Sequence, residues 1–221
     1  MTIVSFTPFP GYTIKKIYKM GGIYMKKLLA LSAALFLTPL STLAISLSDI
    51  QSNPDQYVLV SQDSESACYV DSYSIDSIRY EPPYYAMNGT VYLVLYSSNS
   101  ILRYTVTETY DYNRCSKSLY VAERKAHPNA SKQYIFDLML KEMQMNNGLT
   151  SYTQSTDIWD LDGNFLVSLS SDDMYTLDNI YSVSPVSQCT LNSPSYHVAN
   201  YMFFKGYNEY FGPRFSSKNL Y

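Results

Sequence analysis

The sequence contains few of the side chains with which most enzymes act on their substrates. Its 221 residues include only two histidines, His127 and His197, and three cysteines. The histidines do not form a metal-binding pair such as HExxH, and the chain has no GxSxG motif, glycine-rich phosphate loop or CxxC motif. We therefore expect a protein that is not an enzyme and that binds no metal or cofactor. Spacing leaves open a nucleophilic pair of Cys68 or Cys115 with either histidine, because such partners meet in space.

Three aspartates, Asp157, Asp160 and Asp162, superficially suggest a calcium-binding loop. An EF-hand loop has glycine at its sixth position and a bidentate glutamate at its twelfth. Counted from Asp160, Gly163 stands at the fourth position and Ser171 at the twelfth. The dipeptide Asp162-Gly163 is instead typical of a tight hairpin turn, in which both central residues have positive φ.

Basic residues are scarce in most of the chain. Five of the 16 lysines and arginines lie before residue 28, whereas all 19 acidic residues lie after residue 44. Residues 45–221 therefore carry 11 basic and 19 acidic residues, a net charge of −8. This charge disfavours nucleic acids and anionic membrane surfaces as partners, since both attract clustered Lys and Arg.

The apolar run from Leu28 to Leu37 is too short to anchor the chain, because a membrane-spanning helix needs roughly 20 residues. Met25-Lys26-Lys27 precedes this run and Thr42-Leu43-Ala44 follows it, in the order of a Sec signal peptide. We expect a signal peptide at residues 25–44, cleavage between Ala44 and Ile45, and release into the periplasm or the extracellular space. The residue directly after Ala44 is Ile45 and not a cysteine, so we expect no lipid anchor.

Residues 1–24 precede the expected signal peptide and carry no fold of their own. The codons of Gly21-Gly22 can form a purine-rich ribosome-binding sequence just ahead of Met25. We infer that translation starts at Met25. The alternative is a long leader that is cleaved together with the signal peptide.

Residues 45–221 have the length of one domain. Segments in the first part have strand character, and an antiparallel meander of about five strands is expected. The expected strands are residues 57–61, 68–71, 89–96, 102–112 and 119–122, with a polar loop before and through Pro82-Pro83. Tyrosine accounts for 21 of these 177 residues, which suits either half-buried strand positions or an adhesive surface.

The second part of the domain is expected to form helix, hairpin and helix. Apolar residues recur at helical spacing from Ser131 to Asn147, and the final helix, 194–211, begins at Ser193-Pro194. Strands followed by helices indicate an α+β fold. We expect the helices to pack on one face of the sheet and to leave the other face free for a partner.

The expected mature chain has an odd number of cysteines, Cys68, Cys115 and Cys189. In a simple meander Cys68 and Cys115 would lie at opposite ends of the sheet. We therefore predict a disulfide between Cys115 and Cys189 and a buried thiol at Cys68. Closing this loop of about 75 residues would stabilise the fold by roughly 4 kcal/mol.

The segment Tyr69 to Ile75, YVDSYSI, resembles the "YVD, then Ser-Ile" segment of the surface-adhesin E-like proteins, which are small exported bacterial domains. A cysteine that opens a later strand, as Cys115 was expected to do, is also similar to that family. The similarity covers roughly residues 55–125, and residues 130–221 depart from the short family domain. The resemblance implies an antiparallel sheet with a packed helix and, for some members, binding of host extracellular proteins. It transfers no binding residue to this chain.

These observations favour an exported, non-enzymatic domain that binds a protein or a cell-envelope component. The alternatives are a periplasmic inhibitor or assembly factor, and an enzyme of unrecognised type. A cleft with two converging carboxylates or a Cys–His contact would favour the enzyme. An exposed tyrosine patch would favour binding.

Overall fold

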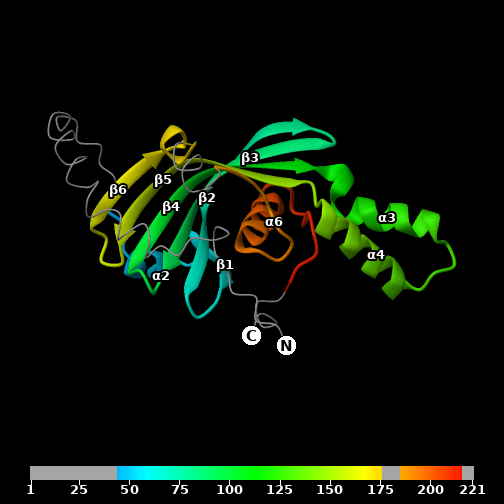
Figure 1. Ribbon diagram of the computed structural model, residues 1–221, viewed down its shortest axis with the longest axis horizontal. Coiled ribbons are helices and arrows are strands. Elements are labelled where there is room, and N and C mark those ends of the chain that lie inside the picture. The colour runs from blue at the N-terminus through cyan, green and yellow to red at the C-terminus, as the bar shows by residue number, and fades with distance from the viewer. Residues whose placement is uncertain (1–43, 176–184, 216–221) are drawn as a thin grey trace. The chain divides into compact units, whose positions relative to one another are not determined.

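A computed structural model describes residues 44–175 and 185–215 of the chain (Figure 1). The expected leader and residues 25–43 of the signal peptide lie outside the described residues. From Ile45 onward, the described residues belong to one compact unit. Its elements are α2 (Leu47–Ser52), β1 (Tyr57–Gln62), β2 (Ser66–Glu81), β3 (Tyr84–Leu95), β4 (Ser100–Asp111), the 3-10 turn η1 (Tyr112–Arg114), α3 (Ser116–Ala126), α4 (Lys132–Met145), β5 (Leu149–Asp160), β6 (Phe165–Ser170), β7 (Val186–Gln188) and α6 (Pro194–Tyr207).

The strands in the described part of the chain form one seven-stranded antiparallel sheet. Six of them follow in sequence order, from β1 to β6, and the short β7 pairs with the first residues of β5. Strands that neighbour each other in both sequence and space form a meander. The structure therefore confirms the predicted α+β class with an antiparallel sheet, although it has more strands than expected.

Two predictions about the strands are wrong. The segment before Pro82-Pro83 was expected to be a loop, but β2 continues through it to Glu81 and pairs with β3 across this two-residue turn. The expected fifth strand, 119–122, lies within α3. Four apolar residues cannot distinguish a strand from a buried helix turn. Here the Cys115 sulfur accepts a hydrogen bond from the backbone N–H of Ser118 at the start of the helix.

The predicted starts of the two longer helices are confirmed. The hydroxyl of Ser131 accepts the N–H of Tyr134 at α4, and Ser193 does the same at α6, where Pro194 takes the first position. The end of α6 differs, because Asn208 adopts a left-handed conformation with φ 54° and stops the helix before the predicted residue 211.

The helices do not all pack on one face of the sheet, contrary to the prediction. Side chains alternate between the two faces of a strand. Tyr92 and Val94 of β3 lie in the core cluster that contains Ile50 of α2. Gly89 lies on the opposite face of β3, and this face contacts α6. A Cβ added at Gly89 would lie 2.8 Å from the Cε of Met202 in α6. Helices α2 and α6 therefore cover opposite faces at different places along the bent sheet (Figure 1).

Helices α3 and α4 pack mainly against each other rather than on the sheet. Their shared core contains the buried side chains of Leu119, Met139 and Met143, with Tyr120, Leu140 and Leu191 packed around them. In Figure 1 this helical pair extends beyond the ends of β4 and β5.

Candidate functional site: the tyrosine hairpin

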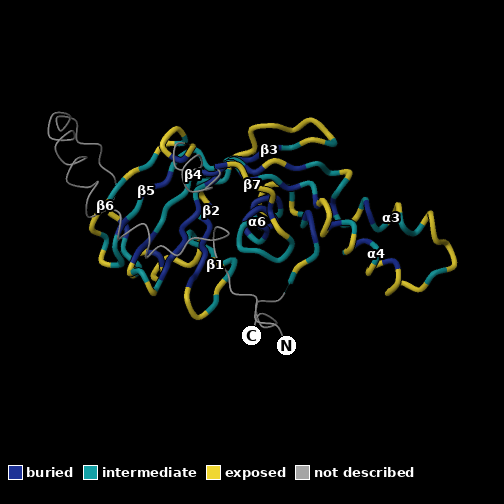
Figure 2. Tube along the Cα trace, viewed as in Figure 1, coloured by how far each residue is buried: buried dark blue, intermediate teal, exposed yellow. Residues whose placement is uncertain are grey.

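The best candidate for a binding surface is the distal part of the β2–β3 hairpin, residues 73–84, which we call the tyrosine hairpin. Figure 2 shows that its β2 side is mostly exposed. Its exposed large apolar side chains are Tyr73 at 73%, Tyr80 at 66%, Ile78 at 50% and Tyr84 at 47%. Exposed aromatic side chains are typical of a protein–protein contact.

Helix α6 holds the tyrosine hairpin from one face. The Tyr207 hydroxyl and the Ser77 hydroxyl lie 2.5 Å apart and share a hydrogen bond. The ring of Tyr207 lies 5.8 Å from that of Tyr80 and 5.2 Å from that of Tyr85, and Tyr85 also packs edge-on against Phe203. These contacts keep the hairpin in position without covering Tyr80.

The opposite face of the hairpin carries charge as well as an aromatic ring. The Arg79 guanidinium forms an ion pair with Glu81 at 2.7 Å and lies 5.5 Å from the centre of the Tyr84 ring. Further along this face, Gln154 donates to the Thr107 hydroxyl, which donates to the Asn88 side chain, both at 2.7 Å. This part of the sheet therefore presents a polar surface.

The tyrosine hairpin was missed in the sequence because its β2 half was assigned to a loop. The sequence YSIDSIRYE from Tyr73 to Glu81 does alternate apolar and polar residues in part, which is a strand signal. Two register shifts, between Asp71 and Asp76 and between Ser77 and Arg79, interrupt that alternation. A bulge adds a residue to one strand, so it hides the two-residue period in the sequence.

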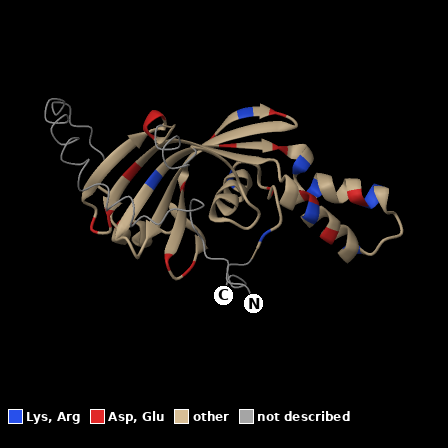
Figure 3. Cartoon of the chain, viewed as in Figure 1, with Lys and Arg blue, Asp and Glu red and all other residues tan. Residues whose placement is uncertain are grey.

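Charge differs between the helical pair and the rest of the domain (Figure 3). From Arg114 to Glu142, the chain has six basic and three acidic residues. The remainder of residues 45–221 has five basic and 16 acidic residues. The local basic excess between Arg114 and Glu142 is a feature that the overall charge of −8 conceals.

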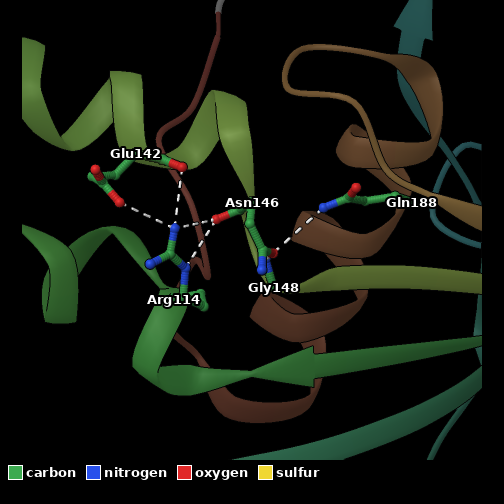
Figure 4. A network of polar contacts seen from close by, with 5 residues as sticks. All are labelled: Arg114, Glu142, Asn146, Gly148 and Gln188. Carbon is green, nitrogen blue, oxygen red and sulfur yellow. Dashed lines mark hydrogen bonds and ion pairs between the residues drawn. The ribbon is translucent and has the colours of Figure 1, made fainter.

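Arg114 ties the end of α4 to the start of α3 (Figure 4). Its Nε and Nη2 atoms donate to the Asn146 carbonyl at 3.0 and 2.8 Å, and Nη2 also donates to the Glu142 carbonyl at 3.2 Å. The Asn146 side chain accepts from the N–H of Gly148, which has φ +71° and leads into β5. The guanidinium thus binds the Asn146 carbonyl at the end of the helix and is a second donor to the Glu142 carbonyl, which also accepts the N–H of Asn146.

We expect Arg114→Met to lower the free energy of unfolding by about 1–3 kcal/mol, because methionine keeps the apolar stem and removes every donor. Urea unfolding measures this change. Lys117→Met is the matched control, since the ammonium of Lys117 is exposed and makes one ion pair with Glu209 at 3.3 Å. Equal losses in the two variants would contradict the role assigned to Arg114.

A second cluster of reactive side chains lies inside the domain around Glu108, which is 1% exposed. Its Oε1 accepts a hydrogen bond from the Ser151 hydroxyl at 2.8 Å, and the Cys189 sulfur lies 3.8 Å from Oε2. Burial raises the pKa of Glu108 to about 8, although its hydrogen bonds oppose this shift. Burial and nearby Glu108 also raise the pKa of Cys68 to about 12. Both groups are therefore neutral at pH 7.

The structure does not contain the predicted Cys115–Cys189 disulfide. All three cysteines are free and buried. The Cys115 sulfur instead lies 3.3 Å from the Ser118 hydroxyl at the start of α3, and the Cys189 sulfur points to Glu108. The prediction placed Cys115 at the start of a fifth strand, and the segment that follows it is a helix.

The predicted cleavage site, Ala44 and Ile45, lies where the compact unit begins. Ala44 is exposed, whereas Ile45 is 7% exposed and belongs to the core cluster with Ile50 and Trp159. Cleavage at this bond stays a prediction. It would leave Ile45 as the first residue of the chain and also as part of its core.

The other sequence candidates have structural roles. The hairpin turn at Asp162-Gly163 joins β5 to β6 as predicted, but only Gly163 has positive φ. Asp160 accepts from the backbone N–H groups of Asp162 and Asn164. His197 is partly buried, its ring Nε2 lies 3.1 Å from Asn192 Oδ1, and burial lowers its pKa.

Within residues 44–175 and 185–215, no group of three or more His, Cys, Asp or Glu side chains could hold a metal ion. No helix there has the length and apolar composition needed to cross a bilayer.

No family model matches the chain, and it matches neither a curated protein nor a solved structure.

Proposed function

We propose that residues 45–221 act outside the cytoplasm as a non-enzymatic binding domain, and that the tyrosine hairpin contacts a protein or a cell-envelope component. One observation carries this proposal: three tyrosines and an isoleucine are exposed on a two-stranded extension of the sheet, with Tyr80 and Tyr84 on its opposite faces. The export signal in the sequence supports the location.

Tyrosine suits this role for a physical reason. Its ring offers apolar area with few rotatable bonds, and its hydroxyl stays hydrated before binding and can donate or accept afterwards. The contacts of Tyr80 and Tyr85 with Tyr207 restrain the hairpin before a partner arrives. Restraint in the free protein lowers the entropy lost on binding.

The alternatives use other features of the chain. A periplasmic inhibitor or assembly factor would use the same tyrosine hairpin on a different partner. An enzyme would need its reactive groups open to solvent, whereas Glu108 and Cys189 are both about 1% exposed. The resemblance to surface-adhesin E-like proteins adds host extracellular proteins to the partners that a binding test should include.

The test is a pull-down with the immobilised domain, residues 45–221, from envelope fractions and from purified host extracellular proteins. We expect Tyr73→Ser/Tyr84→Ser to weaken capture of the wild-type partners about tenfold or more, because aromatic anchors carry most of the energy of a contact. Tyr134→Ser is the control, since Tyr134 is 50% exposed but lies on α4. If the double variant folds and captures the same proteins as wild type, the hairpin is not the binding surface.

A further inference from the structure

The outer edge of β2 is unpaired along the tyrosine hairpin. β1 pairs with β2 only between Ala67 and Asp71, and the Gln56 carbonyl accepts the N–H of Ser72. From Tyr73 to Glu81, no strand among the described residues lies on that side. Such an edge presents free N–H and C=O groups to any strand that approaches it.

The charges on this edge would be complementary between two copies of the chain. Arg79 and Glu81 lie on either side of Tyr80 and are 49% and 70% exposed. If two copies of the strand pair antiparallel with Tyr80 opposite Tyr80, Arg79 of each copy faces Glu81 of the other. A register centred on Arg79 or on Glu81 would instead place like charges opposite each other, which is unfavourable.

The backbone also has the right direction at Tyr80. Glu81 and Tyr84 close the two-residue turn, so their N–H and C=O groups face each other. The next residue along an antiparallel strand turns its groups the other way, so those of Tyr80 face outward. In the register centred on Tyr80, its two copies can exchange both hydrogen bonds. Ile78 lies at the register shift between Ser77 and Arg79, so the regular alternation is confined to residues 79–81.

We propose that the partner of this edge is a second copy of the chain, bound through antiparallel β2–β2 pairing about a two-fold axis at Tyr80. The pairing joins the two sheets and places two tyrosine hairpins side by side, so that a ligand meets two copies of the surface at once. It involves only the few residues around Tyr80 in each strand, so the contact is small and the dimer weak and reversible. The proposal does not depend on whether the hairpin also binds another protein.

Sedimentation from micromolar to millimolar concentration tests the charge pattern. The wild-type domain should shift from monomer toward dimer. Arg79→Glu and Glu81→Arg should each remain monomeric, because each places like charges opposite each other in the dimer. An equimolar mixture of the two variants should associate again, since each copy then faces the opposite charge. A structural effect of either substitution would not be reversed by mixing.

Crosslinking tests the register. In an antiparallel pair that exchanges hydrogen bonds, the two Cα atoms lie about 5.5 Å apart, a spacing that a disulfide spans. Tyr80→Cys should therefore crosslink under mild oxidation, whereas Tyr73→Cys, which is at least as exposed but lies seven residues from the axis, should not. The three native cysteines are buried and do not interfere.

Three results would overturn the proposal. The first is a wild-type domain that stays monomeric at millimolar concentration. The second is self-association of both charge variants to the wild-type extent. The third is equal crosslinking of the two cysteine variants.

Discussion

Glu108→Gln is expected to make the protein more stable at pH 8 by on the order of 3–5 kcal/mol. The carboxyl group is buried, and its contacts are with Ser151 and Cys189, which are neutral. No ion pair to Glu108 is present among the described residues. Glutamine has the same shape, and its carbonyl oxygen can still accept the Ser151 hydroxyl.

The sign of the pH dependence follows from the raised pKa. The pKa rises from an ordinary value of 4.5 to about 8 in the folded protein. Below pH 4.5 the carboxyl is protonated in both states and costs nothing. Between pH 4.5 and 8 the unfolded chain releases the proton and the folded chain keeps it, so the free energy of unfolding falls as pH rises. Above pH 8 the loss is complete.

Urea unfolding from pH 4 to pH 9 measures this effect as the difference between wild type and Glu108→Gln. That difference should grow from pH 4.5 to pH 8 and then level off. Glu65→Gln serves as the control because Glu65 is exposed. A difference that does not change with pH would show that Glu108 is not the titrating group.

Gly212→Ala is expected to destabilise the fold by about 2–4 kcal/mol. A methyl group at Gly212 would overlap the Tyr196 hydroxyl and lie 2.9 Å from the Tyr196 Cζ and 3.1 Å from the Met143 Cε. Neither neighbour can easily move, because Tyr196 is fully buried and its hydroxyl donates to the Pro213 carbonyl at 2.8 Å. The backbone is also held, since Asn200 bonds both the N–H and the carbonyl of Gly212.

The variant Tyr196→Phe identifies the cause of that loss. Alone, it should cost about 1 kcal/mol, because it removes one hydrogen bond. Combined with Gly212→Ala, it also removes the overlapping oxygen, so the double variant should lose less stability than the sum of the two single changes. Thermal unfolding of the four proteins gives the coupling energy. Strict additivity would show that the overlap with the hydroxyl does not cause the loss.

The sequence was sufficient to predict helix caps and turns, because these features depend on residues that are close together in the chain. Ser131 and Ser193 cap α4 and α6 because a hydroxyl reaches an N–H three residues ahead in the same chain. Gly163 turns the chain between β5 and β6 because it accepts positive φ at little cost. The antiparallel meander followed from strand segments with short polar connections.

The tyrosine hairpin, the position of 119–122 in α3 and the partners of the cysteines depended on residues far away in the chain. β2 extends to Glu81 because β3 pairs with it and Tyr207 of α6 supports it, neither of which the interrupted pattern of β2 predicts. Leu119 is buried against Met139 and Met143 of α4, and this packing favours a helix rather than a strand for residues 119–122. The sequence by itself therefore determined where α4 and α6 begin and where the chain turns between β5 and β6, because caps and turns are local. Only the tertiary structure decided which edge and which tyrosines remain exposed, because burial depends on what packs against each strand.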